Sequence, residues 1–431
     1  MFRRAVEPKS SRMVPGRALA RIRTVEKRVL DLVLRRIRHG RVTVDYWDGE
    51  RRTYGGGLPE VTVRIADPSV VRRAVFGASV AVGEAYAAGK LDIAEDELAA
   101  LFQIVHDNRT AFGALARLRR LSRREPNRRA RQSHQISHHY DVGNDYYRLF
   151  LDPSLTYSCA YFEDRDDPLA TAQQQKIDHV LAKLRLEPGQ RLLDIGCGWG
   201  HLAVTAALDH QATVVGITLS SEQLAGAREL AARAGVSDRV RFELCNYQDL
   251  VDPAGTVDPA LAGPFDRVVS VGMFEHAGRA GQAHYVRALD ALLVPGGVSV
   301  LHTITDQRDE PIDAFTDRHI FPGGRLPTVA RIEGLLAERE LWSLDRENLW
   351  QHYAATLAAW RAQHRRHHRQ VVAMFDEPFY RTRDLWLAAS QAGFAHGDLG
   401  LSQFVISKGK PVDWPLTRRH LYPHSSIRPR R

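Results

Sequence analysis

Apolar residues follow two different spacings along the chain, and the spacing changes near residue 184. Beyond that point, short apolar runs alternate with helical segments such as 201–209 and 221–235. This alternation predicts βαβ units and a parallel sheet with helices on both faces. After a long helical insertion at about 311–392, the run 403–408 is expected to close the sheet as an edge strand. The other expected strands are 191–195, 213–217, 240–244, 265–271 and 298–302.

The first part of the chain has a more mixed pattern. Residues 17–38 place apolar side chains at three- and four-residue steps among basic ones, which predicts a basic amphipathic helix. Further on, two strand-like runs flank the turn-rich residues 54–59, and two helical stretches follow, which together predict a small α+β domain. These runs are 41–47 and 60–65 for the strands and 70–86 and 95–106 for the helices.

An arginine-dense stretch divides the chain and is broken by Pro126 and Asn127. We therefore expect an N-terminal α+β domain at 1–116, an arginine-rich linker at 117–132, a catalytic domain at 133–410 and a basic tail at 411–431. The net charge of +9 divides into +13 for residues 1–131 and −4 for the rest. Such a basic module indicates an anionic partner, either a lipid headgroup surface or nucleic acid, with a solvated basic arm as the plain alternative.

Several classes of protein are excluded by composition. No apolar run reaches the roughly 18 residues that a membrane span needs, and the N-terminus lacks the apolar core of a secretory signal. Cys159, Cys197 and Cys245 lie far apart without a CxxC pair, which favours a reducing cytoplasm. The histidine clusters at 134–139 and 364–368 lack carboxylate or cysteine partners at ligand spacing, so we predict no metal site.

The motif at residues 194–200, DIGCGWG, follows a predicted strand and opens a helix. Its glycines allow a tight turn and a close ligand approach, and free amides at a helix N-terminus favour an anionic group. The spacing lacks the third glycine of the NAD fingerprint and is similar to the cofactor loop of S-adenosylmethionine-dependent methyltransferases. Residues 270–276 lack the polar-Pro-Pro-aromatic loop of enzymes that methylate nucleobase amino groups. We therefore predict no nucleic-acid partner.

Several further segments, taken with this loop, resemble the cyclopropane-fatty-acyl-phospholipid synthase family within roughly residues 55–410. The resemblance implies an α/β, Rossmann-like S-adenosylmethionine methyltransferase fold with a helical lipid-binding insertion, plus the small N-terminal α+β domain of phospholipid-acting members. It also implies transfer of a methylene from S-adenosylmethionine to a cis double bond of a phospholipid acyl chain. The segments are HYDVGNDYY from His139, LTYSCAYF from Leu155, GITLSSEQ, SVGMFEH, LHTIT and IFPGG.

In this family, a bound bicarbonate removes a proton from the carbocation and so closes the ring. The resemblance implies that Cys159, Glu275, His302, Ile304 (through its backbone) and Tyr353 hold it. Glu275 and His302 fall at the C-terminal ends of adjacent predicted strands, where such sheets bind ligands. Each residue also has a plain alternative: Cys159 as a small buried residue, Glu275 as a helix cap and His302 as a core histidine.

The cofactor residues are assigned by the same resemblance. Their roles are contacts to the methionine moiety, support beneath it, the ribose position after the second strand, and stacking on adenine. At the ribose position this chain has Thr218 where many methyltransferases carry an acidic residue. The residues are Tyr157, Ser158, Asp194, Gly196, Gly198, Thr218, Gln223, Asn246 and Tyr247.

The apolar and aromatic residues of the insertion are interpreted as the wall of an acyl tunnel, with ordinary helix core as the alternative. The resemblance further implies a homodimer, and a cytoplasmic protein associated peripherally with the inner face of the membrane through anionic phospholipid headgroups. Two other functions stay open. One is a synthase of 10-methyl or methylene fatty acyl phospholipids, and the other is a non-catalytic lipid-binding protein on the same fold.

Overall fold

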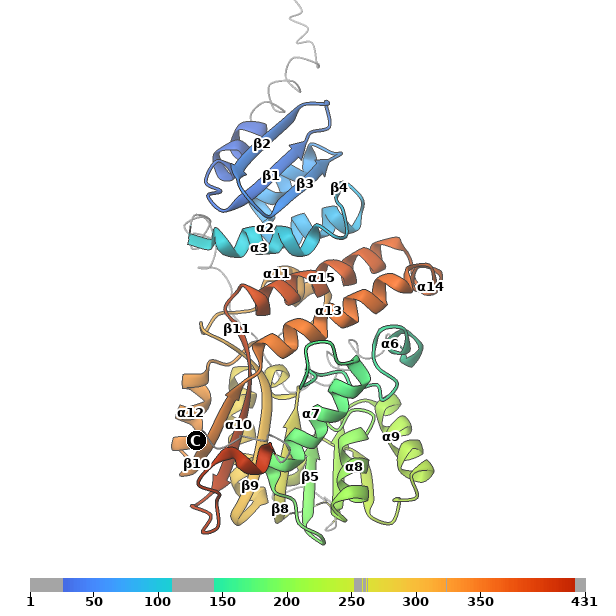
Figure 1. Ribbon diagram of the computed structural model, residues 1–431, viewed down its shortest axis with the longest axis vertical. Coiled ribbons are helices and arrows are strands. Elements are labelled where there is room, and N and C mark those ends of the chain that lie inside the picture. Colours follow the sequence, from blue (N-terminus) through green and yellow to red (C-terminus); the bar gives the residue numbers. More distant parts are fainter. Residues whose placement is uncertain are drawn as a thin grey trace, which may run out of the picture. The chain divides into compact units, whose positions relative to one another are not determined.

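A computed structural model describes residues 26–110, 143–251, 258, 261, 263–322 and 324–422. The chain divides into two compact units, Met1–Leu121 and Ser122–Arg431 (Figure 1). The linker expected at 117–132, residues 17–25 of the first helix, and His134, His138 and His139 lie outside the described residues. In the described part of the chain, no helix is long and apolar enough to cross a membrane.

The first unit contains a four-stranded sheet in the order β2-β1-β3-β4. β1 pairs antiparallel with β2 and parallel with β3, and apolar side chains alternate inward along β1 and β3. Residues 26–34 are helical, as the amphipathic spacing predicts. The elements are β1 (Gly40–Asp45), β2 (Arg51–Gly56), β3 (Glu60–Ile65), α2 (Ser69–Ala87), β4 (Leu91–Ile93) and α3 (Leu98–Asp107).

The second unit is built on a seven-stranded sheet in the order β10-β11-β9-β8-β5-β6-β7. Five neighbouring strands are parallel, whereas β11 runs antiparallel between β9 and β10. From β5 the chain first adds β6 and β7 on one side and then returns to add β8 and β9 on the other side. Open α/β sheets bind ligands at such a switch point. The strands are β5 (Arg191–Ile195), β6 (Thr213–Thr218), β7 (Val240–Leu244), β8 (Phe265–Val271), β9 (Leu293–Asp306), β10 (Leu341–Asn348) and β11 (Leu399–Lys408).

One strand prediction is wrong in position. The run 403–408 does form a strand, but β11 lies inside the sheet and β10 is the edge strand on that side. β10 belongs to the stretch interpreted as a helical insertion. Its burial pattern explains the miss, because Leu341 is buried while most of the following side chains are half-buried or exposed. An edge strand packs on one neighbour only, so it lacks the apolar run by which inner strands are recognised.

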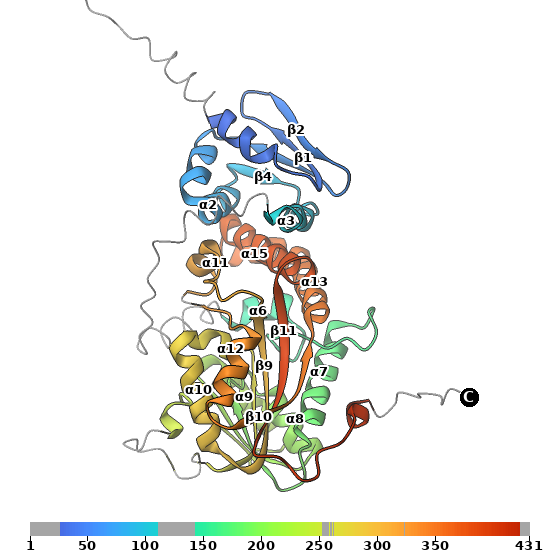
Figure 2. The ribbon, with the colours of Figure 1, turned by 90° about the vertical axis from the view of Figure 1, so that its left-hand side faces the viewer.

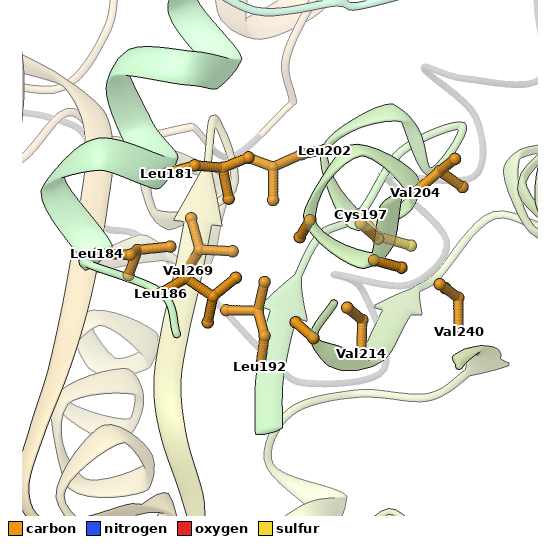
Figure 3. Packing of buried hydrophobic residues seen from close by; sticks show 14 of the residues in the cluster. Leu181, Leu184, Leu186, Leu192, Cys197, Leu202, Val204, Val214, Val240 and Val269 are labelled. Atoms are coloured by element: carbon orange, nitrogen blue, oxygen red, sulfur yellow. The ribbon is translucent and has the colours of Figure 1, made fainter. Parts of the chain in front are cut away.

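Helices cover both faces of this sheet (Figures 1 and 2). On one face, buried side chains of α7, α8 and α9 form a core cluster with β5, β6 and β7. Figure 3 shows Leu181 and Leu184 of α7 facing Val269, with Leu202 of α8 nearby. On the other face, α10 and α12 pack in a second cluster. These helices are α7 (Leu169–Leu184), α8 (His201–Asp209), α9 (Ser221–Arg233), α10 (Gly278–Leu292) and α12 (Val329–Ala337).

The insertion contributes a layer of helices beyond the sheet, in which α13 and α15 run side by side (Figures 1 and 2). A buried ion pair joins them, with Nε of Arg361 2.8 Å from Oδ1 of Asp384. The residues interpreted as a tunnel wall divide: Leu335 and Leu336 belong to the sheet core, and Trp342 is 46% exposed on β10. The remaining elements are α6 (Asn144–Phe150), α11 (Ala314–His319), α13 (Trp350–Arg366), α14 (His368–Met374) and α15 (Glu377–Ala395).

Candidate active site

The glycine loop leaves β5 at Ile195 and enters α8 at His201. All three of its glycines have positive φ, +86° at Gly196, +55° at Gly198 and +86° at Gly200, where L side chains are strained. A Cβ on Gly200 would lie 2.6 Å from Cζ of Phe242. A Cβ on Gly198 would meet nothing within 4 Å. One glycine therefore permits close packing, while the other leaves space above the loop.

A cavity of about 150 Å³ lies over this loop, at the C-terminal ends of β5, β6 and β8. Every residue assigned to the cofactor by resemblance lines it, although these residues come from four separate stretches of the chain. The fold therefore brings together, around one cavity, residues that the sequence could assign only motif by motif. The residues are Tyr157, Ser158, Asp194, Gly196, Gly198, Thr218, Gln223, Asn246 and Tyr247.

At the position that the resemblance assigns to the ribose, the structure has a buried, hydrogen-bonded pair of side chains and no carboxylate. Oγ1 of Thr218 donates to Oε1 of Gln223 at 2.8 Å, and both side chains are buried. The hydroxyl of Ser220 caps α9 by accepting from the backbone N–H of Gln223. The side-chain NH2 of Gln223 is therefore left as a neutral donor beside the cavity.

Lys176, which the sequence reasoning missed, lines the same cavity. Its Nζ donates to Oγ of Ser158 at 3.0 Å. Burial lowers the pKa of Lys176 to about 8 and raises the pKa of Asp194 to about 7. The Lys176 ammonium lowers the pKa of Asp194, Cys159 and His302, which favours the charged forms of Asp194 and Cys159 and the neutral form of His302.

A sequence signal for Lys176 did exist. Along α7, the buried positions Ala172, Lys176, Val180 and Lys183 recur at helical spacing, so two lysines stand on an apolar stripe. A lysine on such a stripe is rarely fully buried unless it is paired. What the stripe does not reveal is the partner of each lysine.

The five residues assigned to the base site lie outside the cavity lining but close to it. Glu275 sits in the short 3-10 helix η3 (Phe274–Ala277), between two cavity-lining residues, Met273 and His276. Its Oε2 accepts from Oγ1 of Thr303 at 2.8 Å. Burial raises the pKa of Glu275, and hydrogen bonds from Thr303 and from the Ile304 backbone oppose that rise. The structure therefore brings Glu275 and Ile304 together.

The helix-cap alternative for Glu275 is not what the structure contains. α10 begins at Gly278 with Ala277 at its N-cap, and no side chain caps it. The Glu275 carboxyl group instead accepts hydrogen bonds from the Thr303 hydroxyl and the Ile304 backbone, so it does not serve as a helix cap. Burial of a carboxylate without a cation in contact is costly, and such perturbed groups concentrate at functional sites.

His302 is 1% exposed and stands on β9 beside the end of β8, as its predicted position requires. Its Nδ1 lies 3.0 Å from Nε2 of Gln403. Its Nε2 has no hydrogen-bond partner among the described residues. Burial, with Lys176 and Lys183 nearby, holds the pKa of His302 well below its ordinary value. The imidazole is therefore neutral and offers one free ring nitrogen.

Cys159 and Tyr353 are joined through α13. The amide of Ala160 donates to Oγ1 of Thr356 at 3.0 Å, one turn along α13 from Tyr353. Cys159 is fully buried, and burial raises the pKa of its thiol, so it is not a nucleophile at neutral pH. The rings of Tyr353 and Tyr157 both pack on Trp360, which links the base-site helix to the cofactor cavity.

Two family models match the chain. Residues 127–404 match the family described as mycolic acid cyclopropane synthetase, and residues 29–115 match a domain of unknown function. The first match spans more than half of the chain. The chain belongs to the mycolic acid cyclopropane synthetase family. The second match falls within the N-terminal unit, so this family member carries a separate module before its catalytic part.

Full-length relatives support the assignment. The Pseudomonas putida protein described as "Probable fatty acid methyltransferase" is 35% identical over 385 residues, covering 87% of this chain and 95% of the relative. The cyclopropane-fatty-acyl-phospholipid synthase of Escherichia coli K12 is 34% identical over 360 residues, covering 82% and 89%.

Solved structures agree with the sequence relatives. The Mycobacterium tuberculosis cyclopropane synthase MmaA2 aligns with a TM-score of 0.59 at 34% identity, covering 64% of this chain and 98% of that one. A mycolic acid cyclopropane synthase, CmaA1, complexed with S-adenosylhomocysteine and CTAB, gives the same values. This cyclopropane synthetase family member is thus an S-adenosylmethionine-dependent methyltransferase.

Proposed function

We propose that the chain is a cyclopropane-fatty-acyl-phospholipid synthase that acts on a cis double bond of a phospholipid acyl chain. The observation that carries the proposal is the buried, neutral His302 with its unpartnered Nε2, on the same strand whose Thr303 hydroxyl donates to the buried Glu275. The 34% identity to the Escherichia coli synthase covers 82% of this chain, more than the second unit alone, and supports a phospholipid rather than a mycolic acid as substrate.

S-adenosylmethionine supplies the methyl group, and a bicarbonate beside Glu275 and His302 supplies the base. The alkene carbon forms a bond to the methyl carbon as the sulfur–methyl bond breaks, which leaves a carbocation on the chain. Loss of a proton from the new methyl group then closes the three-membered ring.

The protein groups have tasks that suit this chemistry. Neither His302 nor Cys159 can serve as the base, since the pKa of His302 lies far below its ordinary value and the Cys159 thiol stays protonated. A bound anion supplies the base in their place. The Nε2 side of the His302 ring can hold it, while the buried surroundings exclude water from the carbocation.

The test is lipid mass spectrometry on the purified full chain, incubated with S-adenosylmethionine and vesicles of a monounsaturated phospholipid. A gain of one CH2 that resists hydrogenation, with ring protons in the NMR spectrum, supports the proposal. The same gain with a branched methyl or methylene signal contradicts ring closure and favours the 10-methyl or methylene alternative. Cofactor binding without any mass gain would contradict phospholipid methylation and favour the non-catalytic alternative.

The membrane partner is also a proposal. On the helix at 26–34 and the turn after it, Arg28, Leu32, Arg35 and Arg36 are exposed along one side, and Leu32 is 68% exposed. Lys27 is instead buried against Asp48 and so is used within the unit. A face of arginines around an exposed leucine suits an anionic headgroup surface, at about 1 kcal/mol per basic residue. The homodimer stays a prediction.

Vesicle co-sedimentation tests this surface. Reversing two of its charges (Arg28→Glu with Arg36→Glu) should reduce binding to anionic vesicles at least about tenfold and leave the weak binding to zwitterionic vesicles unchanged. A matched control reverses Arg165 and Arg287, two exposed arginines of the second unit. Equal losses in both variants, or undiminished binding in the first, would contradict the proposal.

A further inference from the structure

His302 is the end of a chain of buried polar contacts that leads away from the cavity. Its Nδ1 lies 3.0 Å from Nε2 of Gln403, and Oε1 of Gln403 lies 2.5 Å from Nζ of Lys183. The register of β9 and β11 places Gln403 directly opposite His302. All three residues are at most 1% exposed, so water does not compete for these contacts.

The donors and acceptors of Lys183, Gln403 and His302 allow only one orientation of the Gln403 side-chain amide. A lysine ammonium has donors and no acceptor, so the atom of Gln403 that faces Lys183 is its carbonyl oxygen. The amide NH2 of Gln403 therefore faces His302. An NH2 group must find an acceptor, which makes Nδ1 of His302 the unprotonated nitrogen. In a neutral imidazole the proton then resides on Nε2.

The positive charge on Lys183 is stabilised by the carboxylate of Glu347. Burial lowers the pKa of Lys183, but Oε2 of Glu347 lies 2.5 Å from its Nζ and favours the ammonium. The same oxygen lies 2.7 Å from Nε2 of His179, and the other carboxylate oxygen accepts from the hydroxyl of Tyr422 at 3.3 Å. These contacts hold the pKa of Glu347 well below its usual range, so it stays a carboxylate.

At the other end, the Nε2–H of His302 is buried with no hydrogen-bond partner among the described residues. A buried donor left unpaired costs about 1–3 kcal/mol, so natural proteins rarely keep one without a ligand for it. Because the imidazole is neutral, it can donate a hydrogen bond to an anion without surrendering a full proton to it. A protonated ring would neutralise the base that the reaction needs.

We propose that Gln403 and Lys183 are positioning residues that hold His302 in its Nε2–H tautomer, so that the ring donates to the anionic base of the reaction. This inference rests on the proposed function for the identity of the anion. The tautomer itself is a property of the resting protein and can be measured without turnover.

The first measurement is the 15N NMR spectrum of the full chain with labelled histidine, with His302 assigned by the signal that His302→Gln removes. An Nε2–H pattern for His302 supports the inference. An Nδ1–H pattern overturns it, whether or not the protein makes cyclopropane lipids. Failure of the proposed function would appear instead as absence of cyclopropane product from wild-type protein, which leaves the tautomer reading intact.

The second measurement uses Gln403→Glu. A carboxylate can accept from Lys183 but cannot donate to His302, so the ring must move its proton to Nδ1. We expect the 15N pattern to switch and kcat to fall about 100-fold, while the KM for S-adenosylmethionine and the affinity for S-adenosylhomocysteine change less than twofold.

A neighbouring variant, Ser402→Ala, controls for disturbance of β11, because Ser402 is also buried but bonds to Thr305 instead. We expect it to keep both the tautomer and the rate. A loss of rate in Gln403→Glu without a change of tautomer, or a change of tautomer without a loss of rate, would overturn the inference. Should Gln403→Glu fail to fold, Gln403→Met removes the donor without adding charge, and its spectrum should show a mixture of tautomers. A pure Nε2–H signal there would overturn the role of Gln403.

Discussion

Nζ of Lys176 donates a hydrogen bond to Oγ of Ser158 at 3.0 Å, from the wall of the cofactor cavity. Ser158 belongs to the segment between α6 and α7, so this contact ties that segment to α7. It also places a cation beside the buried carboxyl group of Asp194. The lysine thus contributes both a fixed hydroxyl and a positive charge to the cofactor site.

Lys176→Met should therefore weaken S-adenosylhomocysteine binding by about tenfold, the value of one charged hydrogen bond. The wild-type affinity should itself fall as the pH rises through about 8, where the lysine loses its proton, and the variant should lack this dependence. Isothermal titration calorimetry between pH 6.5 and 9.5 measures both. Lys408→Met serves as the control, since Lys408 is bonded to Asp290 and does not line the cavity. A variant with the wild-type pH dependence would contradict this role.

Glu275→Gln should retain cofactor binding and lose most turnover. The amide keeps the shape and can still accept from Thr303, so the cavity is unchanged, but the negative charge at the base site is gone. We expect S-adenosylhomocysteine affinity within twofold of wild type and a fall in kcat of about 10²-fold or more. Near-normal turnover on lipid vesicles would remove Glu275 from the base site.

Thr303→Val should raise the pKa of the Glu275 carboxyl group by removing a hydrogen bond to it. The Thr303 hydroxyl lowers the pKa of Glu275 against the opposing effect of burial, so its removal raises that pKa further. If Glu275 acts as a carboxylate, the pH at which activity is half lost on the acidic side should move upward. Unfolding should become easier by about 1–3 kcal/mol. The pH profile of kcat, compared with that of Thr305→Val on the same strand, measures the effect. An unshifted acidic limb would exclude control of Glu275 by Thr303.

Inner strands were predictable from sequence because they are buried on both faces. β5 and β8 begin and end where their apolar runs do. β2 and β10 were not found, because an edge strand buries few side chains. In β2 only Tyr54 is buried, and two glycines made its end read as a turn.

The residues that line the cavity were predictable as a group, because each of those assigned by resemblance belongs to a motif at the end of a strand or to the segment before α7. The residues behind them were not. Lys183 and Gln403 are 220 positions apart, and nothing in either local sequence indicates that they meet. Such pairs arise only when β11 inserts beside β9, a step that the strand pattern left open.

The pH dependence of stability should carry the signature of Asp194. Burial raises its pKa to about 7, whereas the unfolded chain has a value near 3.9. Between these two pH values the native chain binds more protons than the unfolded chain. The contribution of Asp194 to the free energy of unfolding is therefore full below about pH 4 and is lost as the pH rises through 7. The unfolding free energy of wild type minus that of Asp194→Asn should therefore fall from pH 4 to pH 7 in urea titrations. A constant or rising difference would contradict a raised pKa.

Alanine substitutions at Gly198 and Gly200 should separate binding from stability. Both residues have positive φ, so each variant carries a backbone cost of about 1–2 kcal/mol. At Gly200 the new Cβ would also lie 2.6 Å from Cζ of Phe242 and 2.9 Å from Cβ of Ala227, which adds roughly 1–3 kcal/mol of overpacking.

At Gly198 the new methyl group meets no protein atom within 4 Å, but this glycine lines the cofactor cavity. Gly198→Ala should thus unfold only slightly more easily than wild type and yet bind S-adenosylhomocysteine at least tenfold more weakly. Gly200→Ala should be the less stable of the two by at least about 1 kcal/mol. Urea unfolding and calorimetry on both proteins measure the two quantities. Equal stabilities with unchanged binding in Gly198→Ala would mean that the loop does not lie against the cofactor.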